Sequence, residues 1–333
     1  MIHQKQLIYT IIIGFFITII LGPLIIPFLK KLKVGQTVRD EGPKSHSIKS
    51  GTPTIGGIII IISIFITSLT SGIINRDLWV ALFVTLAFGI IGFIDDFIKV
   101  VMKRNLGLRA YQKLILQIIV AVILAIYKTS QSHEAINTKI LIPFIDGQFE
   151  IGSLSIPQYL DLGVLYIPFI VFVVVATVNS ANLTDGLDGL ASGVTLIIAA
   201  FFGFVAMQEG FTSLAIFASA VTGACLGFLK FNSHPAQVFM GDTGSLALGG
   251  AIASLAVLMN VTLIIPIVGG IYFAESLSVI IQVFSFRLTG KRVFKMSPLH
   301  HHYELSGWAE TKVVTVFWIT TVILCLIGWL GLF

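Results

Sequence analysis

The sequence predicts an all-α polytopic membrane protein, and three observations support that prediction. Hydrophobic residues make up 56% of the 333-residue chain, whereas charged residues make up only 11%. The mean hydropathy of the whole chain is +0.98. The apolar residues recur in runs from one end of the chain to the other. Because soluble domains carry about 25% charged residues, this composition excludes an ordinary water-soluble enzyme and requires lipid as the solvent.

Ten apolar runs approach the roughly 20 residues that a helix needs to cross a bilayer. We therefore expect about ten transmembrane helices. No small-residue cleavage site follows the first run, so we expect a span there and not a signal peptide. The ninth run contains Pro266 and Gly269-Gly270, which predicts a tilted, kinked or broken helix. The runs lie at 7–29, 55–72, 79–95, 112–127, 162–180, 190–207, 213–229, 243–259, 262–286 and 311–332.

Lysine and arginine are distributed unequally between the two sides of this helix array. The loops after the odd-numbered spans, with the adjoining span ends, contain 17 of the 21 basic residues. The other side contains only Lys5, Arg76, Lys128 and Lys139. Since basic loops remain in the cytoplasm, we predict that the loops after odd-numbered spans are cytoplasmic and that both termini lie outside.

The longest outside loop, at about 128–161, contains two segments of strand character. Residues 139–145 and 148–151 flank the turn-forming pair Asp146-Gly147, which predicts a small extracytoplasmic hairpin. No low-complexity linker divides the chain, so we expect a single domain over residues 1–333. The cytoplasmic loops that we expect to form the active-site face are 30–54, 95–112, 180–190, 230–243 and 287–311.

Carboxylates gather at span ends on the predicted cytoplasmic side. Asp95 and Asp96 close the third span, and Lys99 lies one helical turn beyond Asp95. An isolated pair of this kind is as consistent with a solvated helix end as with a site. In a site, one carboxylate can hold a hard cation while its neighbour accepts a proton, as phosphoryl transfer requires.

Two further polar segments interrupt the apolar runs. The loop at 180–190 contains Asn182, Asp185 and Asp188, and a helix N-cap accounts for one of these residues but not for the set. Asp242 stands between two glycines where the eighth span begins. Backbone N–H groups at a helix start attract anions, while the Asp242 carboxylate offers oxygen to a cation, although a plain N-cap is the alternative. Phe239 is suited to stacking on a planar base.

Three consecutive histidines, His300, His301 and His302, follow a basic cluster before the last span. A zinc site would need a cysteine partner or the H-E-x-x-H spacing, and neither accompanies them. We therefore favour hydrogen bonding to a diphosphate or a nucleotide. The glycine-rich segment that begins at Lys49 is also placed to meet phosphate, although the start of a helix explains it better.

These segments place carboxylates, lysines and histidines from five loops on one membrane face. Such a face suits phosphoryl transfer from a soluble, metal-bound donor to a membrane-embedded acceptor. The rival from a different class is a transporter of nucleotide sugars or organophosphates. Transporters place their charges near the bilayer midplane, where this chain has only one acidic residue, Glu275.

The same segments resemble a known family. Asp95-Asp96, the segment NLTDGLDGL at 182–190 and the segment FMGDTGS at 239–245 are similar to the polyprenyl-phosphate N-acetylhexosamine-1-phosphate transferases. The segment SPLHHHYEL at 297–305, with Gly307-Trp308, resembles the phospho-N-acetylmuramoyl-pentapeptide transferase branch. Transferases of UDP-N-acetylglucosamine (UDP-GlcNAc) carry a different histidine loop. The resemblance covers essentially the whole chain.

The resemblance implies transfer of phospho-MurNAc-pentapeptide from UDP-MurNAc-pentapeptide to undecaprenyl phosphate, which yields lipid I and UMP for peptidoglycan synthesis. It implies a Mg²⁺-dependent homodimer in the bacterial cytoplasmic membrane, with the active site facing the cytoplasm and no nucleic-acid partner. Transfer from UDP-GlcNAc to a polyprenyl phosphate is the alternative within the same class.

The resemblance also implies roles for individual residues. Asp242 is the expected magnesium ligand, Asp95 is the candidate base for the lipid phosphate, and Asp96 supports the site. On the substrate side, the nucleotide wall is expected to consist of Asn182, Asp185 and Asp188. The expected uracil contacts are Asn232 and Phe239. The groups expected to bind the phosphates and the nucleoside are Lys49, Lys99, His300, His301 and His302.

Overall fold

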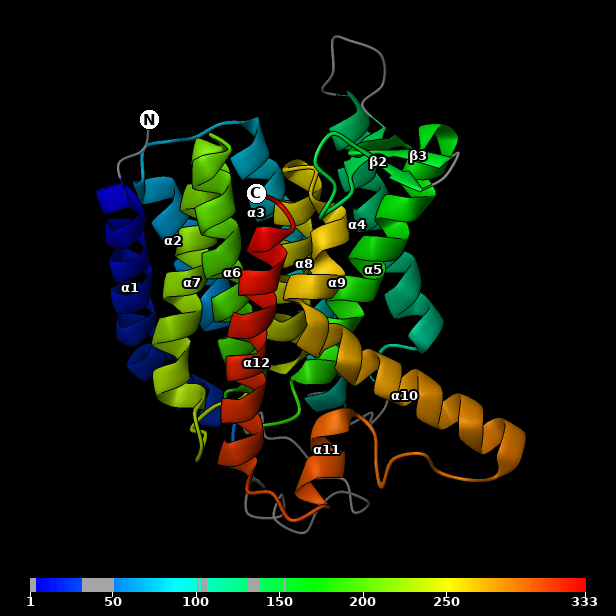
Figure 1. The fold of residues 1–333 in the computed structure, drawn as a ribbon. Helices are drawn as coiled ribbons and strands as arrows, with labels where there is room; N and C mark the ends of the chain where they lie inside the picture. The colour runs from blue at the N-terminus through cyan, green and yellow to red at the C-terminus, as the bar shows by residue number, and fades with distance from the viewer. Residues whose placement is uncertain (1–3, 32–50, 101, 103–106, 131–137, 152–153) are drawn as a thin grey trace.

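A computed structural model describes residues 4–31, 51–100, 102, 107–130, 138–151 and 154–333. Within this part of the chain, nine helices are long and apolar enough to cross a membrane, which confirms the predicted class. Figure 1 shows them as one bundle in which α1 begins and α12 ends at the same end of the molecule. The nine are α1 (Gln4–Lys31), α3 (Arg76–Val100), α4 (Ala110–Ser130), α5 (Tyr166–Thr184), α6 (Leu190–Gln208), α7 (Thr212–Asn232), α8 (Gly241–Leu258), α10 (Gly270–Thr289) and α12 (Glu310–Leu330).

The second predicted span, at 55–72, is a shorter helix, α2 (Gly57–Thr70), of 14 residues. At 1.5 Å per residue it is about 21 Å long, less than the roughly 30 Å hydrocarbon core. Backbone hydrogen bonds join the residues just before α2 to the segment that leads into α8. Phe239 donates its N–H to the carbonyl of Pro53 (2.8 Å), and the Phe239 carbonyl accepts the N–H of Gly56 (2.9 Å). These bonds satisfy backbone groups that lipid would leave without partners.

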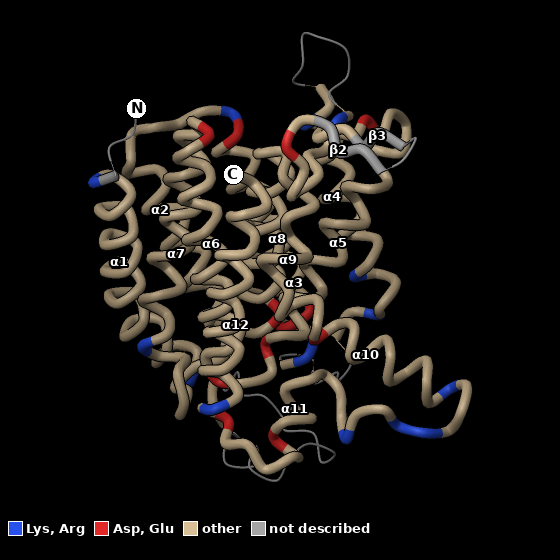
Figure 2. Tube along the Cα trace, in the orientation of Figure 1, with Lys and Arg blue, Asp and Glu red and all other residues tan. Residues whose placement is uncertain are grey.

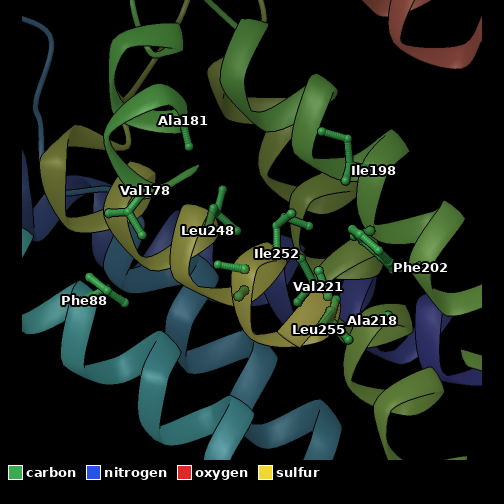
Figure 3. Close-up of a cluster of buried hydrophobic side chains, with 14 of the residues drawn as sticks. Phe88, Val178, Ala181, Ile198, Phe202, Ala218, Val221, Leu248, Ile252 and Leu255 are labelled. Carbon is green, nitrogen blue, oxygen red and sulfur yellow. The ribbon is translucent and has the colours of Figure 1, made fainter. Parts of the chain in front are cut away.

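Helix α8 lies at the centre of the bundle, and every residue from 243 to 258 is buried. Figure 3 shows Leu248, Ile252 and Leu255 of α8 surrounded by side chains of neighbouring helices. Small residues let these helices approach closely. A Cβ atom at Gly249 would lie 2.7 Å from the backbone of Val178 in α5. The segment at the start of α8 is therefore held by the most deeply buried of the nine candidate spans in the described part of the chain.

The ninth predicted span is broken, as its proline and glycines indicate. A 3-10 turn, η3 (Thr262–Ile264), leads into the short helix α9 (Ile265–Val268), and Gly269 separates α9 from α10. Figure 1 shows α10 leaving the bundle at an angle. The chain returns through the short helix α11 (Leu299–Glu304) to α12.

The outside loop contains strands, but their pairing differs from the predicted hairpin. Strand β1 (Lys139–Leu141) pairs with β4 (Tyr159–Asp161), and β2 (Gln148–Ile151) pairs with β3 (Leu154–Pro157), both antiparallel. The predicted pairing of 139–145 with 148–151 across Asp146-Gly147 is wrong. Segment 154–161 supplies an antiparallel partner for both earlier strands, and its Gln158 also donates to the carbonyl of Gly147 (2.9 Å).

A short 3-10 helix, η2 (Gly163–Leu165), joins this loop to α5. Just before it, the Asp161 carboxylate accepts hydrogen bonds from the Thr138 hydroxyl and the Gly163 N–H. These two donors, the hydroxyl above all, lower the pKa of Asp161 below its ordinary value.

Candidate active site

The candidate site forms where the end of α3 meets the start of α8. A Cβ atom at Gly92 in α3 would lie 2.1 Å from the carbonyl oxygen of Asp242 in α8, so only glycine allows the two backbones to come this close. One turn further along α3 come Asp95 and Asp96. Figure 2 shows acidic and basic residues together at this end of the bundle, next to α11.

Asp96 holds the first turn of α8 from the neighbouring helix. Its side chain is buried and accepts the backbone N–H groups of Asp242 (3.2 Å) and Thr243 (2.9 Å) and the hydroxyl of Thr243 (2.6 Å). The first N–H groups of a helix have no partner within the helix, and Asp96 supplies one across the helix contact. Its oxygens therefore position Asp242.

Asp242 is the centre of the charged cluster. Its Oδ2 atom lies 3.0 Å from the Lys99 ammonium and 2.8 Å from the Lys113 ammonium. Its Oδ1 atom accepts the Asn182 amide at 2.9 Å. The same amide lies 2.8 Å from the Ser245 hydroxyl. Three helices, α3, α4 and α5, thus direct donors at one carboxylate, and this order requires few rearrangements when a charged substrate arrives.

Asp95 also contacts Lys99. Its Oδ2 is 2.5 Å from the Lys99 ammonium, and its Oδ1 accepts the N–H of Leu108 (2.8 Å). Gly107 allows this contact, because a Cβ atom there would lie 2.6 Å from Asp95 Oδ1 and because its φ is +57°. One Lys99 ammonium therefore joins Asp95 and Asp242.

The three aspartates suit a divalent cation. Asp95, Asp96 and Asp242 can each offer one carboxylate oxygen, and these oxygens lie within 4.8 Å of one another. Oxygen-only ligand sets with several carboxylates favour hard ions such as Mg²⁺. The chemistry of the donor set thus fits the metal that the resemblance implies.

A second cluster joins the α5–α6 turn to the start of α12. The Asp188 carboxylate accepts the N–H of Ala236 (3.0 Å) and lies 3.3 Å from His234 Nδ1. The Asp188 N–H donates to Glu310 (2.8 Å), whose other oxygen lies 3.4 Å from the same histidine nitrogen. The turn is therefore fastened on both sides.

Asn232 also holds the α5–α6 turn in place. It is buried, accepts the N–H of Gly189 (3.2 Å) and the hydroxyl of Ser192 (2.8 Å), and donates to the carbonyl of Val238 (3.0 Å). Its amide thus binds the α5–α6 turn to the segment that leads to α8. In the structure, the Asn232 side chain therefore forms its hydrogen bonds with groups of the protein itself.

The three histidines occupy different environments. His300 is buried, with Nδ1 3.1 Å from the Glu275 carboxylate of α10 and with its ring against Gly186. His301 lies 2.9 Å from Glu304. His302 accepts the backbone N–H of Lys295 at 3.1 Å. His300 therefore packs against the α5–α6 turn and supports it. His301 and His302 are only partly buried.

The remaining predicted residues are distributed as follows. Phe239 has a half-buried ring on a backbone that hydrogen bonds fix on both sides. Asp185 ends α5, and its N–H donates to the Asn182 carbonyl (3.2 Å). Lys49 lies outside the described residues. The structure thus brings Asp95, Asp96, Lys99, Asn182 and Asp242 into one cluster and places Asp188 and Asn232 in another.

Sequence reasoning gave no role to several residues that the site uses. Lys113, Thr243, Ser245 and Glu310 all contact a predicted site residue. The sequence could have pointed to Lys113, because it is the one charged side chain in the first turns of α4. It could also have pointed to Glu275, because Glu275 is a lone acidic residue within an apolar span.

Glu275 provides a test of the histidine arrangement. Its carboxylate is buried and receives the N–H of His300 as well as facing the imidazole. A hydrogen bond to a charged group stabilises by about 1.5–3 kcal/mol. We expect Glu275→Ala to lower the thermal midpoint of the purified protein and Glu275→Gln to lower it less. Equal midpoints for Glu275→Ala and the parent protein would show that this contact does not hold α11.

The fold and the cluster define an integral membrane enzyme with a charged centre at one end of its helix bundle. Residues 78–260 match the family model described as glycosyl transferase family 4. The chain is 77% identical over 331 residues to the phospho-N-acetylmuramoyl-pentapeptide-transferase of Alkaliphilus oremlandii (strain OhILAs), covering 99% of each chain. It is 75% identical over 332 residues to the same-named protein of Alkaliphilus metalliredigens (strain QYMF), covering both completely.

A relative of the same name from Clostridioides difficile (strain 630) is 54% identical over 334 residues, again covering both chains completely. The chain therefore belongs to the phospho-N-acetylmuramoyl-pentapeptide-transferase family, within glycosyl transferase family 4. The family resemblance drawn from its motifs is confirmed.

Proposed function

We propose that this enzyme transfers phospho-MurNAc-pentapeptide from UDP-MurNAc-pentapeptide to undecaprenyl phosphate, forming lipid I and releasing UMP. The observation that carries the proposal is the Asp242 carboxylate, on which Lys99, Lys113 and Asn182 converge. The full-length similarity to proteins named for this transfer supports the choice of substrates. The transporter alternative lacks such support.

The magnesium ion would be held chiefly by Asp242, with Asp95 beside it, while Asp96 holds the α8 backbone. When bound, Mg²⁺ would neutralise the diphosphate and polarise the bond that breaks. The proposal of a metal ligand at Asp242 rests on the three converging carboxylates.

We propose direct transfer in one step. A phosphate oxygen of undecaprenyl phosphate bonds to the β-phosphorus of the UDP substrate, the bond from that phosphorus to the bridging oxygen breaks, and the electron pair leaves with UMP. Lys99 and Lys113 offset the negative charge that gathers on the phosphoryl oxygens. Asp95 is the candidate group to accept a proton from the lipid phosphate. Positioning and charge neutralisation are sufficient for this step.

The nucleotide side of the pocket is proposed at the α5–α6 turn. Asn182, Asp185 and Asp188 would form its wall, and the half-buried ring of Phe239 is placed for stacking on uracil. Asn232 holds the backbone next to that ring. Lys49, His301 and His302 are the proposed phosphate and nucleoside contacts, and His300 supports the turn.

We also propose that the enzyme lies in the bacterial cytoplasmic membrane with this site facing the cytoplasm. The excess of basic residues on the α11 side supports that orientation. A homodimer is proposed from the family resemblance alone. Size-exclusion chromatography with light scattering in detergent would test the dimer.

The decisive assay combines UDP-MurNAc-pentapeptide, undecaprenyl phosphate and Mg²⁺, and it is repeated in the presence of a metal chelator. We expect lipid I and UMP in equal amounts, and no product after chelation. A parallel reaction uses UDP-GlcNAc as donor. Turnover of UDP-GlcNAc alone would replace the proposed donor with the alternative one.

The one-step scheme has its own test. The enzyme is incubated with UDP substrate radiolabelled at the β-phosphate, without lipid acceptor, and is then denatured. We expect no label on the protein. A labelled aspartate would show that a phospho-enzyme forms first.

Lys113→Met should reduce transfer by about a hundredfold, because removal of one group that stabilises transition-state charge costs about 10²–10³ in rate. Its ammonium lies 2.8 Å from Asp242. Lys128→Met is the matched control, since it removes the same charge from the other end of α4, where Lys128 donates to the Leu258 carbonyl (2.9 Å). Initial rates per milligram of monodisperse protein are compared. Equal rates for the two variants would remove Lys113 from the site.

A further inference from the structure

The outer part of α10 and the turn after it form a surface that the proposed reaction does not use. We call residues 277–295 the α10 arm. Figure 1 shows α10 extending away from the bundle toward the side where α11 lies. Its large apolar side chains are exposed, with Phe284 65% and Leu288 69% accessible. No other described helix covers this surface of the arm.

Basic residues are interleaved with these apolar side chains. Arg287, Lys291 and Arg292 are exposed, and Figure 2 shows blue at the far end of the arm. The sequence contains no acidic residue between Glu275 and Glu304. None of the ion pairs among the described residues involves these three cations. The arm is thus apolar and positively charged at once.

We propose that the α10 arm is a docking surface for anionic phospholipid headgroups of the leaflet on the α11 side. Exposed apolar side chains enter the headgroup boundary, while adjacent lysines and arginines are attracted to anionic lipids. A soluble nucleotide would meet the positive charge but would give no reason for exposed Val283, Phe284 and Leu288 beside it. Charge complementarity and the apolar surface together select a lipid surface.

Hydrogen bonds link the α10 arm to α11, the helix that carries His300, His301 and His302. Gln282 accepts the N–H groups of Val293 (3.0 Å) and Phe294 (2.9 Å) and donates to the Phe294 carbonyl (2.9 Å). Lys295 donates its N–H to His302 and its ammonium to the Leu305 carbonyl (3.0 Å). The lipid contact of the arm therefore fixes the position from which α11 meets the α5–α6 turn.

The test places a fluorescent label on the arm and measures its contact with lipid. Thr289→Cys is labelled in the full-length protein, whose two native cysteines are buried. The protein is reconstituted in nanodiscs of phosphatidylcholine alone or with phosphatidylglycerol, each with headgroup-labelled quencher lipid. We expect stronger quenching in the anionic discs, and we expect high salt to remove the difference.

Matched double variants identify the residues responsible. Lys291→Gln with Arg292→Gln should abolish the dependence of quenching on anionic lipid. Lys30→Gln with Lys31→Gln, an equally exposed basic pair at the end of α1, should leave it unchanged. Wild-type quenching that is equal in the two lipid compositions would overturn the proposal, as would equal loss in both variants.

The lipid substrate is itself anionic, so one further experiment distinguishes its headgroup from the phosphate of bulk phospholipid. The Lys291–Arg292 double variant is assayed for transfer in phosphatidylcholine discs that contain undecaprenyl phosphate as the only anionic lipid. We expect its apparent KM for undecaprenyl phosphate to match that of the parent protein. A raised KM would show that the arm binds the substrate headgroup and would overturn assignment to bulk phospholipid.

Discussion

Asp242→Asn should lower the rate of transfer by about a thousandfold. The substitution keeps the shape of the side chain but removes the charge that lies 3.0 Å from Lys99 and 2.8 Å from Lys113. Loss of one preorganised electrostatic group costs about 10²–10³ in rate, and the proposed metal ligand is lost with it. Single-turnover rates at saturating Mg²⁺ measure the effect.

Asp77→Asn is the control for this change. Asp77 lies at the other end of α3, where its carboxylate accepts the Tyr127 hydroxyl at 3.0 Å. An asparagine oxygen can accept the same bond, so transfer and thermal midpoint should stay close to those of the parent protein. If Asp242→Asn retained more than a tenth of the parent rate, Asp242 would be neither the metal ligand nor the electrostatic centre.

The association of α3 with α8 could be anticipated only in outline. Hydropathy and the distribution of basic residues predict that Asp95, Asp96 and Asp242 share one membrane face. They do not predict that Asp96 accepts the N–H groups of Thr243 and Asp242. That contact depends on the close approach at Gly92, and a periodicity of apolar residues carries no information about which helix lies opposite.

Two other features show what local sequence leaves undetermined. The histidine run predicts hydrogen bonding to a diphosphate or a nucleotide, but His300 faces Glu275, a residue of a different helix. Asp146-Gly147 is a strong local turn signal, yet β1 pairs with β4 because a partner further along the chain is available. In both cases, a contact between distant segments decides the outcome. The break at Gly269, by contrast, depends on local backbone chemistry, and the sequence predicts it correctly.

Gly92→Ala should abolish transfer and destabilise the protein, even though it adds only one methyl group. The new Cβ atom would lie 2.1 Å from the carbonyl oxygen of Asp242, 2.3 Å from its carbonyl carbon and 2.6 Å from the N–H nitrogen of Thr243. These are backbone atoms that cannot rotate away, so α3 and α8 must separate. Overpacking of a core costs about 1–3 kcal/mol, and the separation also removes Asp96 from the start of α8.

Gly203→Ala is the matched control, because it makes the same change inside α6. There the new Cβ atom would meet its nearest neighbour, the Ala218 side chain, at an ordinary 3.5 Å. We expect parent-like transfer and an unchanged or slightly higher thermal midpoint, since alanine is the better helix former by about 1 kcal/mol. Thermal unfolding and transfer are measured on both variants in the same detergent. Parent-like activity in Gly92→Ala would mean that close contact of α3 with α8 is not what assembles the site.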